Sequence, residues 1–407
     1  MDKTKIFLLK ISRSASNYTA EIALPATAYE LLDAFEKIHI TNQQDMSMEI
    51  LSCELDYLPQ FIASDVNVDE LNHLAGRLSS MSQWELDCFE GVVMMDAIQM
   101  QYAPIAIDRL INMTHSMSDC HVVYEAHDDA SLGKFYADNG FVQELETLSE
   151  RIFPWLDYGK IGKEMREGEG GVFAPNGYVV QNGEIAEIYQ SGDAVPTEKP
   201  DYAVLLLVEK AQEQVVAGEM VQVNKSLLLS LPATDEAIRQ AVEAVGADSL
   251  IECTLQALDC MVPQLSALIA DELQDCESDI AVINSLAEQL HEMSDSELRT
   301  YKAMLEAAPD DISLEDALDL AGQTEKFSLI TEAISPADYA KIELHRMMSH
   351  EGDAGLARFC NLDGYGRFLM EKDGVMQTSY GLLEQQSEQT LAECLNRSDP
   401  SHSMEMK

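Results

Sequence analysis

The residues best suited to chemistry lie close together in one short segment. It holds two histidines and three carboxylates, namely His121, Glu125, His127, Asp128 and Asp129. Imidazole and carboxylate groups ligate zinc and act as general bases, so a metal site or a proton-transfer site must be considered. The segment, however, has the pattern of a strand followed by a helix, with Asp128 or Asp129 suited to the helix N-cap, and the two histidines fall on opposite sides of this junction. We therefore expect a capping role, with no catalytic residue and no metal site.

A glycine-rich run, Gly168-Glu-Gly-Gly171, could suggest phosphate binding. A phosphate cradle precedes a helix, whereas this run follows one, and no Gly-Lys-Ser or Gly-Lys-Thr comes after it. A helix stop followed by a turn is the better interpretation. The sequence also has no nucleophile elbow and no His-Glu-x-x-His motif, and its eight cysteines include no Cys-x-x-Cys pair. We expect a protein that is not an enzyme and that uses no cofactor.

Carboxylates are the chemical group that this chain has in great excess. Asp and Glu number 72 against 26 Lys and Arg, which gives a formal net charge of -46, although 46% of the residues are hydrophobic. Disordered acidic chains lack the apolar residues that form a core, so we expect the acid on an ordered surface. So large a charge repels nucleic acid and costs stability through self-repulsion, which favours a positively charged partner. A solvated acidic surface without a partner is the alternative.

The acid is concentrated in two stretches that we expect to be helical. From Gln240 to Leu298 there are thirteen acids and no Lys or Arg, and Arg77 is the only base between Lys37 and Arg109. Acids three or four residues apart on a helix lie about 5–6 Å from each other, a spacing comparable in scale with that of DNA phosphates. We predict that these acids form a partner-binding surface that copies the charge outline of a duplex. The predicted surface consists of Asp65, Asp69, Glu70, Glu85, Asp87, Glu90, Asp96, Asp108, Asp271, Glu272, Asp275, Glu277, Asp279, Glu288, Glu292, Asp295 and Glu297.

A repeated pattern organises the chain. Leu24-Pro-Ala-Thr27 returns as Leu231-Pro-Ala-Thr234, and the segment Leu71 to Leu86 returns as Ile283 to Leu298 with eight residues in register. Repeats at a fixed shift indicate duplicated structural units. We therefore expect the following divisions: an α+β subdomain at 1–64, an acidic helical subdomain at 65–118, a second α+β subdomain at 119–182, a linker at 183–201, a divergent second copy at 202–383 and a helical to disordered tail at 384–407.

Periodicity predicts the elements of the first copy. The capping-box spacings Thr27-x-x-Glu30, Ser82-x-x-Glu85 and Ser294-x-x-Glu297 predict helix starts, the last two at the same place in both copies. The other expected elements are strands at 5–11, 21–24, 46–55 and 120–125, helices at 27–38, 107–117, 129–139 and 158–167, and a hairpin that turns at Asn176-Gly177. A helix-turn-helix hairpin is expected over 71–93, with a break at Met81-Ser82. No apolar stretch approaches the ~18 residues of a membrane helix, and the N-terminus lacks a signal-peptide pattern, so we expect a cytoplasmic protein.

Two blocks of the first copy resemble the ArdA antirestriction proteins. Asp69-Glu-Leu-Asn-His-Leu-Ala-Gly-Arg-Leu, followed by Ser-Gln-Trp-Glu-Leu-Asp-Cys-Phe-Glu90, is similar to the helical middle of that family, and Leu156 to Met165 with Gly177-Tyr-Val is similar to its C-terminal part. In the second copy the resemblance is carried mainly by 283–298 and 362–365. It implies a strongly acidic α+β protein that mimics bent B-form DNA, occupies the DNA-binding groove of type I restriction-modification enzymes and is carried by mobile genetic elements.

The expected fold class is α+β: an elongated tandem repeat of small antiparallel-sheet and helix units alternating with acidic helical bundles. Typical members of the resembled family have the size of one copy and associate as dimers, so the double length suggests a pseudo-dimer within one chain, and further homodimerisation stays open. The expected partner is the DNA-binding core of a type I restriction-modification enzyme, with no nucleic acid and no membrane. The alternative is an acidic scaffold that binds another basic or DNA-binding protein, such as another defence system.

Overall fold

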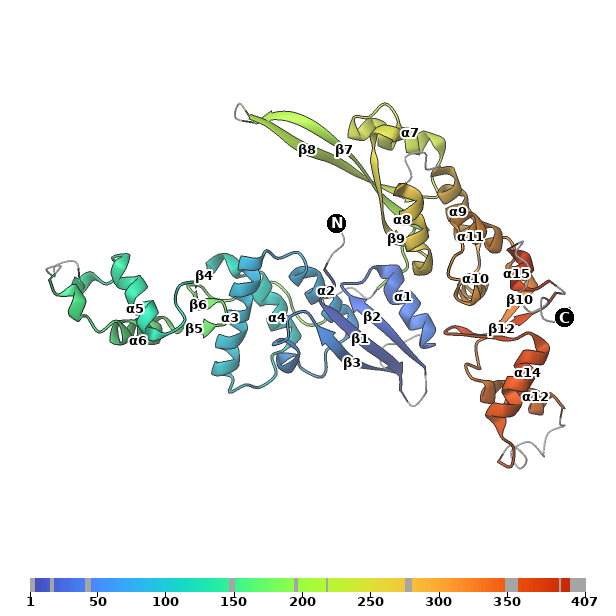
Figure 1. The fold of residues 1–407 in the computed structure, drawn as a ribbon, viewed down its shortest axis with the longest axis horizontal. Coiled ribbons are helices and arrows are strands. Elements are labelled where there is room, and N and C mark those ends of the chain that lie inside the picture. Colours follow the sequence, from blue (N-terminus) through green and yellow to red (C-terminus); the bar gives the residue numbers. More distant parts are fainter. Residues whose placement is uncertain are drawn as a thin grey trace, which may run out of the picture. The chain divides into compact units, whose positions relative to one another are not determined.

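The computed structural model describes residues 4–14, 18–40, 45–145, 151–193, 197–216, 219–274, 280–347, 358–387 and 389–395. In these ranges the chain is a mixed α+β protein with four three-stranded antiparallel sheets (Figure 1). It divides into two compact units, one of residues 1–11, 21–26 and 43–197 and the other of residues 12–20, 27–42 and 198–407. None of the described helices is both long and apolar enough to cross a membrane.

The first sheet consists of β1 (Phe7–Arg13), β2 (Thr19–Leu24) and β3 (Met46–Cys53), in the order β2-β1-β3. Phe7, Leu9 and Ile11 are buried, whereas Lys10 between them is exposed, which is the alternation of a strand with one covered face. The three strands predicted here are confirmed, with ends displaced by up to two residues.

The helical middle of the first unit contains α2 (Val68–Leu78), α3 (Gln83–Gln99) and α4 (Ile107–Thr114). Leu71, Leu74 and Leu78 recur at helical spacing and are buried. The capping box predicted at Ser82 is confirmed, because its hydroxyl accepts from the Glu85 amide and the Glu85 carboxylate accepts from the Ser82 amide. Helix α4 ends three residues before the predicted Met117.

The last part of the first unit pairs two helices with a small sheet. Helices α5 (Asp129–Asp138) and α6 (Tyr158–Glu169) cross at Gly133 and Gly162, where an added Cβ would lie 1.9 and 1.8 Å from backbone oxygens, so only glycine fits the crossing. Helix α6 ends at Gly170, whose φ of 72° makes it the predicted helix stop. The sheet has the order β4-β6-β5, formed by β4 (Cys120–Val123), β5 (Val172–Ala174) and β6 (Gly177–Gln181), and it includes the predicted hairpin.

The second unit begins with another three-stranded sheet, two of whose strands are longer than those of the first sheet. Its order is β8-β7-β9, formed by β7 (Val204–Val216), β8 (Glu219–Leu231) and β9 (Thr254–Cys260), and helix α7 (Asp235–Val245) packs on β7 and β8. Four helices follow: α8 (Ser266–Gln274), α9 (Ile280–Glu292), α10 (Asp295–Ala307) and α11 (Leu314–Ala321). The capping box predicted at Ser294 is confirmed.

Helix α1 (Ala28–Lys37), which starts at the predicted Thr27–Glu30 capping box, belongs to this second unit. Tyr29 joins the hydrophobic core that the second unit builds from α7 to α11. The unit closes with β10 (Phe327–Ile330), α12 (Pro336–Met347), α14 (Leu362–Asp373), β11 (Met376–Thr378), β12 (Gly381–Gln385) and the short helix α15 (Leu391–Cys394). Its sheet order β10-β12-β11 has the same pattern as β4-β6-β5. The disorder predicted at 399–403 lies outside the described residues.

Candidate partner-binding surface

Three acids of the predicted surface are buried, and their assignment to a surface was wrong. The carboxylate of Glu70 is buried against residues more than a hundred positions away, because Oε1 accepts from the Ser191 hydroxyl at 2.7 Å and from the Gly192 amide at 3.1 Å. The other oxygen accepts from Asn67 at 2.9 Å. A buried carboxylate is tolerated where donors satisfy it, so Glu70 anchors the segment expected to be a linker instead of facing a partner.

Asp87 and Asp96 on α3 are the other two buried acids. Asp87 accepts from the Asn176 side chain at 2.7 Å, from Gln83 at 2.9 Å and from the Tyr124 hydroxyl at 3.1 Å. Asp96 forms an ion pair with Arg109, whose Nε donates to Oδ1 at 2.7 Å, and this hydrogen bond raises the pKa of Arg109. Both carboxylates therefore join α3 to neighbouring elements and are unavailable to a partner.

Two further acids of the predicted set have helix-capping roles. Hydrogen bonds from Ser82 lower the pKa of Glu85, and hydrogen bonds from Ser294 lower the pKa of Glu297, so both carboxylates stay ionised at neutral pH. Negative charge in the first turn of a helix is favourable because it interacts with the helix dipole. Glu297 is exposed as well as capping, whereas Glu85 is half-buried, so neutralising either would also weaken a helix start.

The remaining predicted acids between 65 and 108 differ in exposure. Asp65 is exposed, while Asp69, Glu90 and Asp108 are half-buried. The Thr197 hydroxyl donates to Asp69 at 2.6 Å. Burial, with a smaller contribution from the nearby charge of Asp87, raises the pKa of Glu90. The segment 65–108 therefore presents far less of the predicted acid to solvent than its sequence suggested.

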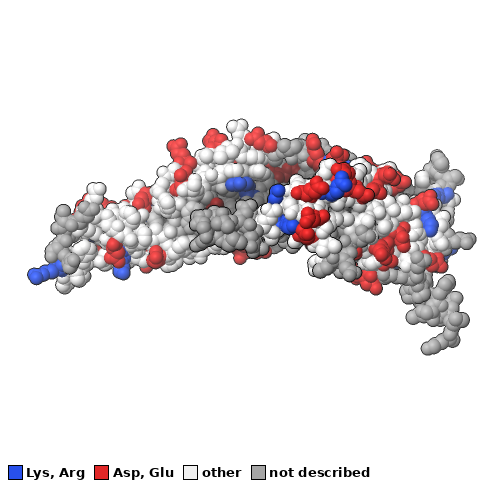
Figure 2. Space-filling model, turned by 90° about the horizontal axis from the view of Figure 1, so that it is seen from above, with Lys and Arg blue, Asp and Glu red and all other residues white. Residues whose placement is uncertain are grey.

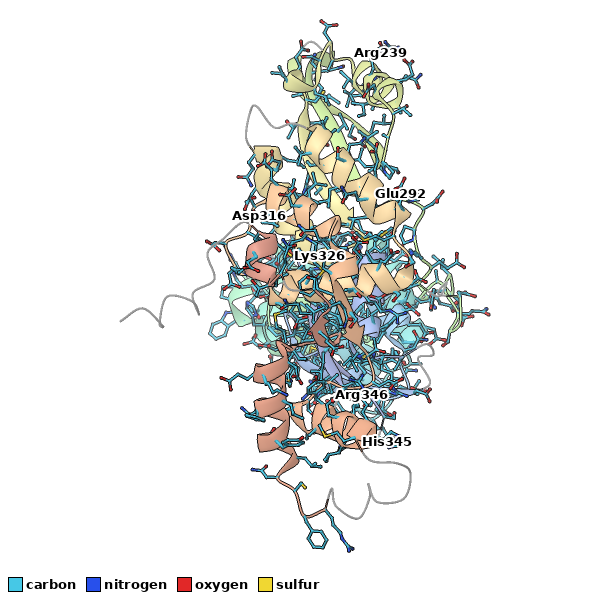
Figure 3. The ribbon with its side chains drawn as sticks, turned by 90° about the vertical axis from the view of Figure 1, so that its right-hand side faces the viewer. Arg239, Glu292, Asp316, Lys326, His345 and Arg346 are labelled. Carbon is cyan, nitrogen blue, oxygen red and sulfur yellow. The ribbon has the colours of Figure 1, made fainter. Side chains whose placement is uncertain are left out.

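The predicted acids at 271–297 are different, because most of those that the structure describes face solvent. Asp271 on α8, Glu288 and Glu292 on α9 and Asp295 on α10 are exposed, and Glu272 is half-buried. Glu292 projects away from the end of α9 in Figure 3. Of the predicted acids at 271–297 that the structure describes, Asp295 is the one in an ion pair, at 3.2 Å from the largely exposed Lys199. Asp275, Glu277 and Asp279 lie outside the described residues.

Sequence reasoning missed a neighbouring group of exposed acids on and before α11. They follow the predicted stretch after Arg299 and Lys302 and are Asp310, Asp311, Glu315 and Asp319. Their signal was present, because no Lys or Arg occurs between Lys302 and Lys326. With the exposed acids of α8, α9 and α10 they form what we call the α8–α11 acidic surface, defined by Asp271, Glu288, Glu292, Asp295, Glu297, Asp310, Asp311, Glu315 and Asp319. Figure 2 shows how far Asp and Glu outnumber Lys and Arg on one face of the protein.

The histidine and carboxylate cluster at 121–129 has the capping structure that was expected of it. Asp128 is the N-cap of α5 and accepts from the Ser131 amide at 2.7 Å. Asp129 accepts from Arg166 at 2.8 Å, which lowers the pKa of Asp129. His121 and His127 are exposed. In the part of the chain that the structure describes, no group of three or more His, Cys, Asp or Glu side chains is arranged to hold a metal ion.

No family model matches this chain, and no curated protein matches it.

Proposed function

We propose that the protein is an antirestriction protein that acts as an acidic DNA mimic and occupies the DNA-binding groove of a type I restriction-modification enzyme. The observation that carries the proposal is the α8–α11 acidic surface, where carboxylates on and beside four successive helices face solvent, and where Asp271, Glu288, Glu292 and Glu297 are in no ion pair among the described residues. Such carboxylates compete for the Lys and Arg side chains that otherwise contact phosphates. The resemblance of the first copy to the ArdA proteins supports the same function and implies a cytoplasmic protein carried by a mobile element.

We further propose that the chain is a tandem repeat whose copies act as the two halves of the mimic. Two observations support this proposal. The sheet β8-β7-β9 has the same pattern of strand order as β2-β1-β3, and β10-β12-β11 has the same pattern as β4-β6-β5. In addition, one side-chain contact occurs twice. The Asn72 side chain bonds both the amide and the carbonyl of Ala26, at 2.7 and 3.0 Å. The Asn284 side chain does the same with Ala233, at 2.8 and 3.1 Å. The burial of Glu70 and Asp87 in the first copy implies that the halves contribute unequal charge.

The test is competition with DNA for a purified type I restriction-modification complex, measured by DNA binding and by cleavage while salt is titrated. Inhibition should weaken as salt rises, because the contacts are between charged groups. A triple variant, Asp271→Asn with Glu288→Gln and Glu292→Gln, should lose much of the inhibition, because it removes three exposed carboxylates that make no ion pair among the described residues.

The matched control neutralises three acids that do have a basic neighbour. Asp138, Glu167 and Asp363 pair with Lys134, Lys163 and Arg367, at 3.5, 3.8 and 2.9 Å. The control variant, Asp138→Asn with Glu167→Gln and Asp363→Asn, changes the net charge by the same amount as the first triple variant. It should nevertheless inhibit as strongly as the unsubstituted protein. Equal effects of both triple variants would indicate a general charge effect and contradict the proposed surface. No competition against several type I enzymes would favour the alternative, an acidic scaffold for another basic protein.

A further inference from the structure

Two buried cysteines of the first unit are in contact with each other. Cys88 on α3 and Cys120, the first residue of β4, are 32 positions apart in the sequence, and both are buried. The Cys120 thiol donates to the Cys88 carbonyl, with Sγ 3.9 Å from the oxygen. Of the seven cysteines that the structure describes, Cys88 and Cys120 are joined by a hydrogen bond between their thiols.

Helix α3 lies tightly against the sheet β4-β6-β5 at this point (Figure 1). Gly91 follows Cys88 by three positions and therefore lies on the same face of the helix. An added Cβ at Gly91 would lie 2.4 Å from Cβ of Val179 on β6, so a larger residue would collide with the sheet. Val179 pairs with Val122 on β4, two residues after Cys120. The packing of the helix on the sheet therefore holds the two thiols together.

The contact makes the two thiols chemically unequal. The hydrogen bond with Cys88 lowers the pKa of Cys120, whereas the same hydrogen bond, together with burial, raises the pKa of Cys88. Cys120 is therefore the thiol that ionises first. The thiolate is the form of cysteine that attacks an oxidant, so Cys120 is the attacking group and Cys88 is the second thiol that can form a disulfide with it.

Cys120 also lies close to solvent although it is buried. Strand β4 is at the edge of its sheet, and Asp119 and His121, on either side of Cys120, are both exposed. The end of a short edge strand opens at a lower free-energy cost than the core does. A small neutral oxidant can therefore reach the Cys120 sulfur through a local opening of β4, without unfolding of the unit.

We propose that Cys88 and Cys120 form an oxidation site, at which hydrogen peroxide converts the two thiols into a disulfide that ties α3 to β4. The Cys120 thiolate attacks one peroxide oxygen, the O–O bond breaks, and the hydroxide that leaves takes up the proton released by Cys120. The Cys88 sulfur then attacks the sulfenic sulfur of Cys120. The S–S bond forms, the S–O bond breaks, and a second water leaves with the Cys88 proton. Two thiols and one peroxide thus give one disulfide and two waters.

The test is treatment of the reduced full chain with hydrogen peroxide, followed by alkylation, proteolysis and mass spectrometry without reduction. We expect a cross-linked peptide that contains Cys88 and Cys120 and that disappears after dithiothreitol, because thiol exchange reverses the bond. The oxidised protein should also melt about 5 °C higher than the reduced protein, because the bond closes a loop in the unfolded chain.

The variant Cys88→Ala separates the two steps of the reaction. Without the second thiol, Cys120 should stop at the sulfenic acid, which dimedone labels, and peroxide should no longer raise the melting temperature. Far-ultraviolet circular dichroism equal to that of the wild type shows that the variant is folded. The peptide map of the wild type decides the proposal even if this buried substitution unfolds the protein.

Cys260 is the matched control within the same chain. It is also buried, but burial raises its pKa to about 12, so it should remain a thiol in peroxide. The exposed Cys360 reports that the peroxide is active. The proposal is overturned if Cys88 and Cys120 remain thiols when Cys360 is oxidised, or if the cross-linked protein melts no higher than the reduced one. Neither result would affect the proposed DNA mimicry, because the site contains none of the acids of the α8–α11 acidic surface.

Discussion

Lys302 on α10 and Asp33 on α1 form a buried ion pair across 269 positions of the sequence, with Lys302 Nζ 2.9 Å from Asp33 Oδ1. The same ammonium group lies 2.7 Å from Glu36, and the Tyr380 hydroxyl donates to Asp33 at 2.8 Å. Four side chains from three distant segments thus satisfy one another inside the second unit. This network holds helix α1 against helix α10, together with the packing of Tyr29 in the core.

Replacing one partner of this pair should be costly. We expect Lys302→Met to lower the free energy of unfolding by about 3 kcal/mol, because it leaves the buried Asp33 carboxylate with only the partly exposed Lys37 as a cation. Urea unfolding measures the change. The double variant Asp33→Asn with Lys302→Met should recover part of the loss, because no unpaired charge remains at Asp33. A double variant less stable than Lys302→Met alone would contradict this account.

The same pair should make stability depend on pH in acid. Burial opposes ionisation of Asp33, but Lys302 and Lys37 outweigh burial and hold the pKa of Asp33 below its usual value. A depressed carboxyl pKa contributes stability above the unfolded pKa of about 3.9, and the contribution is lost as pH falls through the folded pKa. The difference in unfolding free energy between the wild type and the double variant should therefore be constant from about pH 5 to 8 and narrow below about pH 4. A difference that stays constant into acid would argue against the assignment.

The ionised carboxylate of Glu90 should lower the stability of the folded protein, whereas that of Asp33 raises it. Its pKa is raised by burial and by the charge of Asp87, so its ionised form costs the folded protein stability at neutral pH. We expect Glu90→Gln to raise the melting temperature at pH 7 and to have little effect below about pH 4, where the carboxyl group is protonated in both states. Thermal unfolding of the wild type and the variant, at pH 7 and again below about pH 4, measures this difference in melting temperature. A variant that is less stable than the wild type at pH 7 would show that Glu90 makes a stabilising contact.

The repeated asparagine contacts predict similar losses in both copies. Asn72→Ala and Asn284→Ala each remove two hydrogen bonds to one alanine backbone, so each should destabilise the protein by about 1–3 kcal/mol. Asn182 is exposed, and Asn182→Ala is the control expected to change stability little. Calorimetric unfolding of the three variants measures the losses. If only one of the two asparagines matters, the proposed structural equivalence of the copies loses its support.

Local interactions made much of the fold predictable. The capping boxes at Thr27, Ser82 and Ser294 each join residues three positions apart, so the sequence alone places those helix starts. The same holds for the helix stop at Gly170 and for the hairpin turn at Asn176-Gly177, which depend on the backbone freedom of glycine and on immediate neighbours. The length of the β7–β8 ribbon, in contrast, had no clear local signal.

The sequence by itself determined the excess of acid, the stretches that lack bases and the local starts and stops of helices, because composition and interactions over three or four residues suffice for them. Only the tertiary structure decided which acids face solvent. Glu70 and Asp87 have the same local setting as exposed acids, but Ser191 and Asn176 reach them from distant parts of the chain and satisfy them inside the protein. The physical reason is that a carboxylate can be buried only where hydrogen-bond donors satisfy it. Here folding brings those donors in from distant parts of the chain, and the residues next to the acid in the sequence do not indicate that contact.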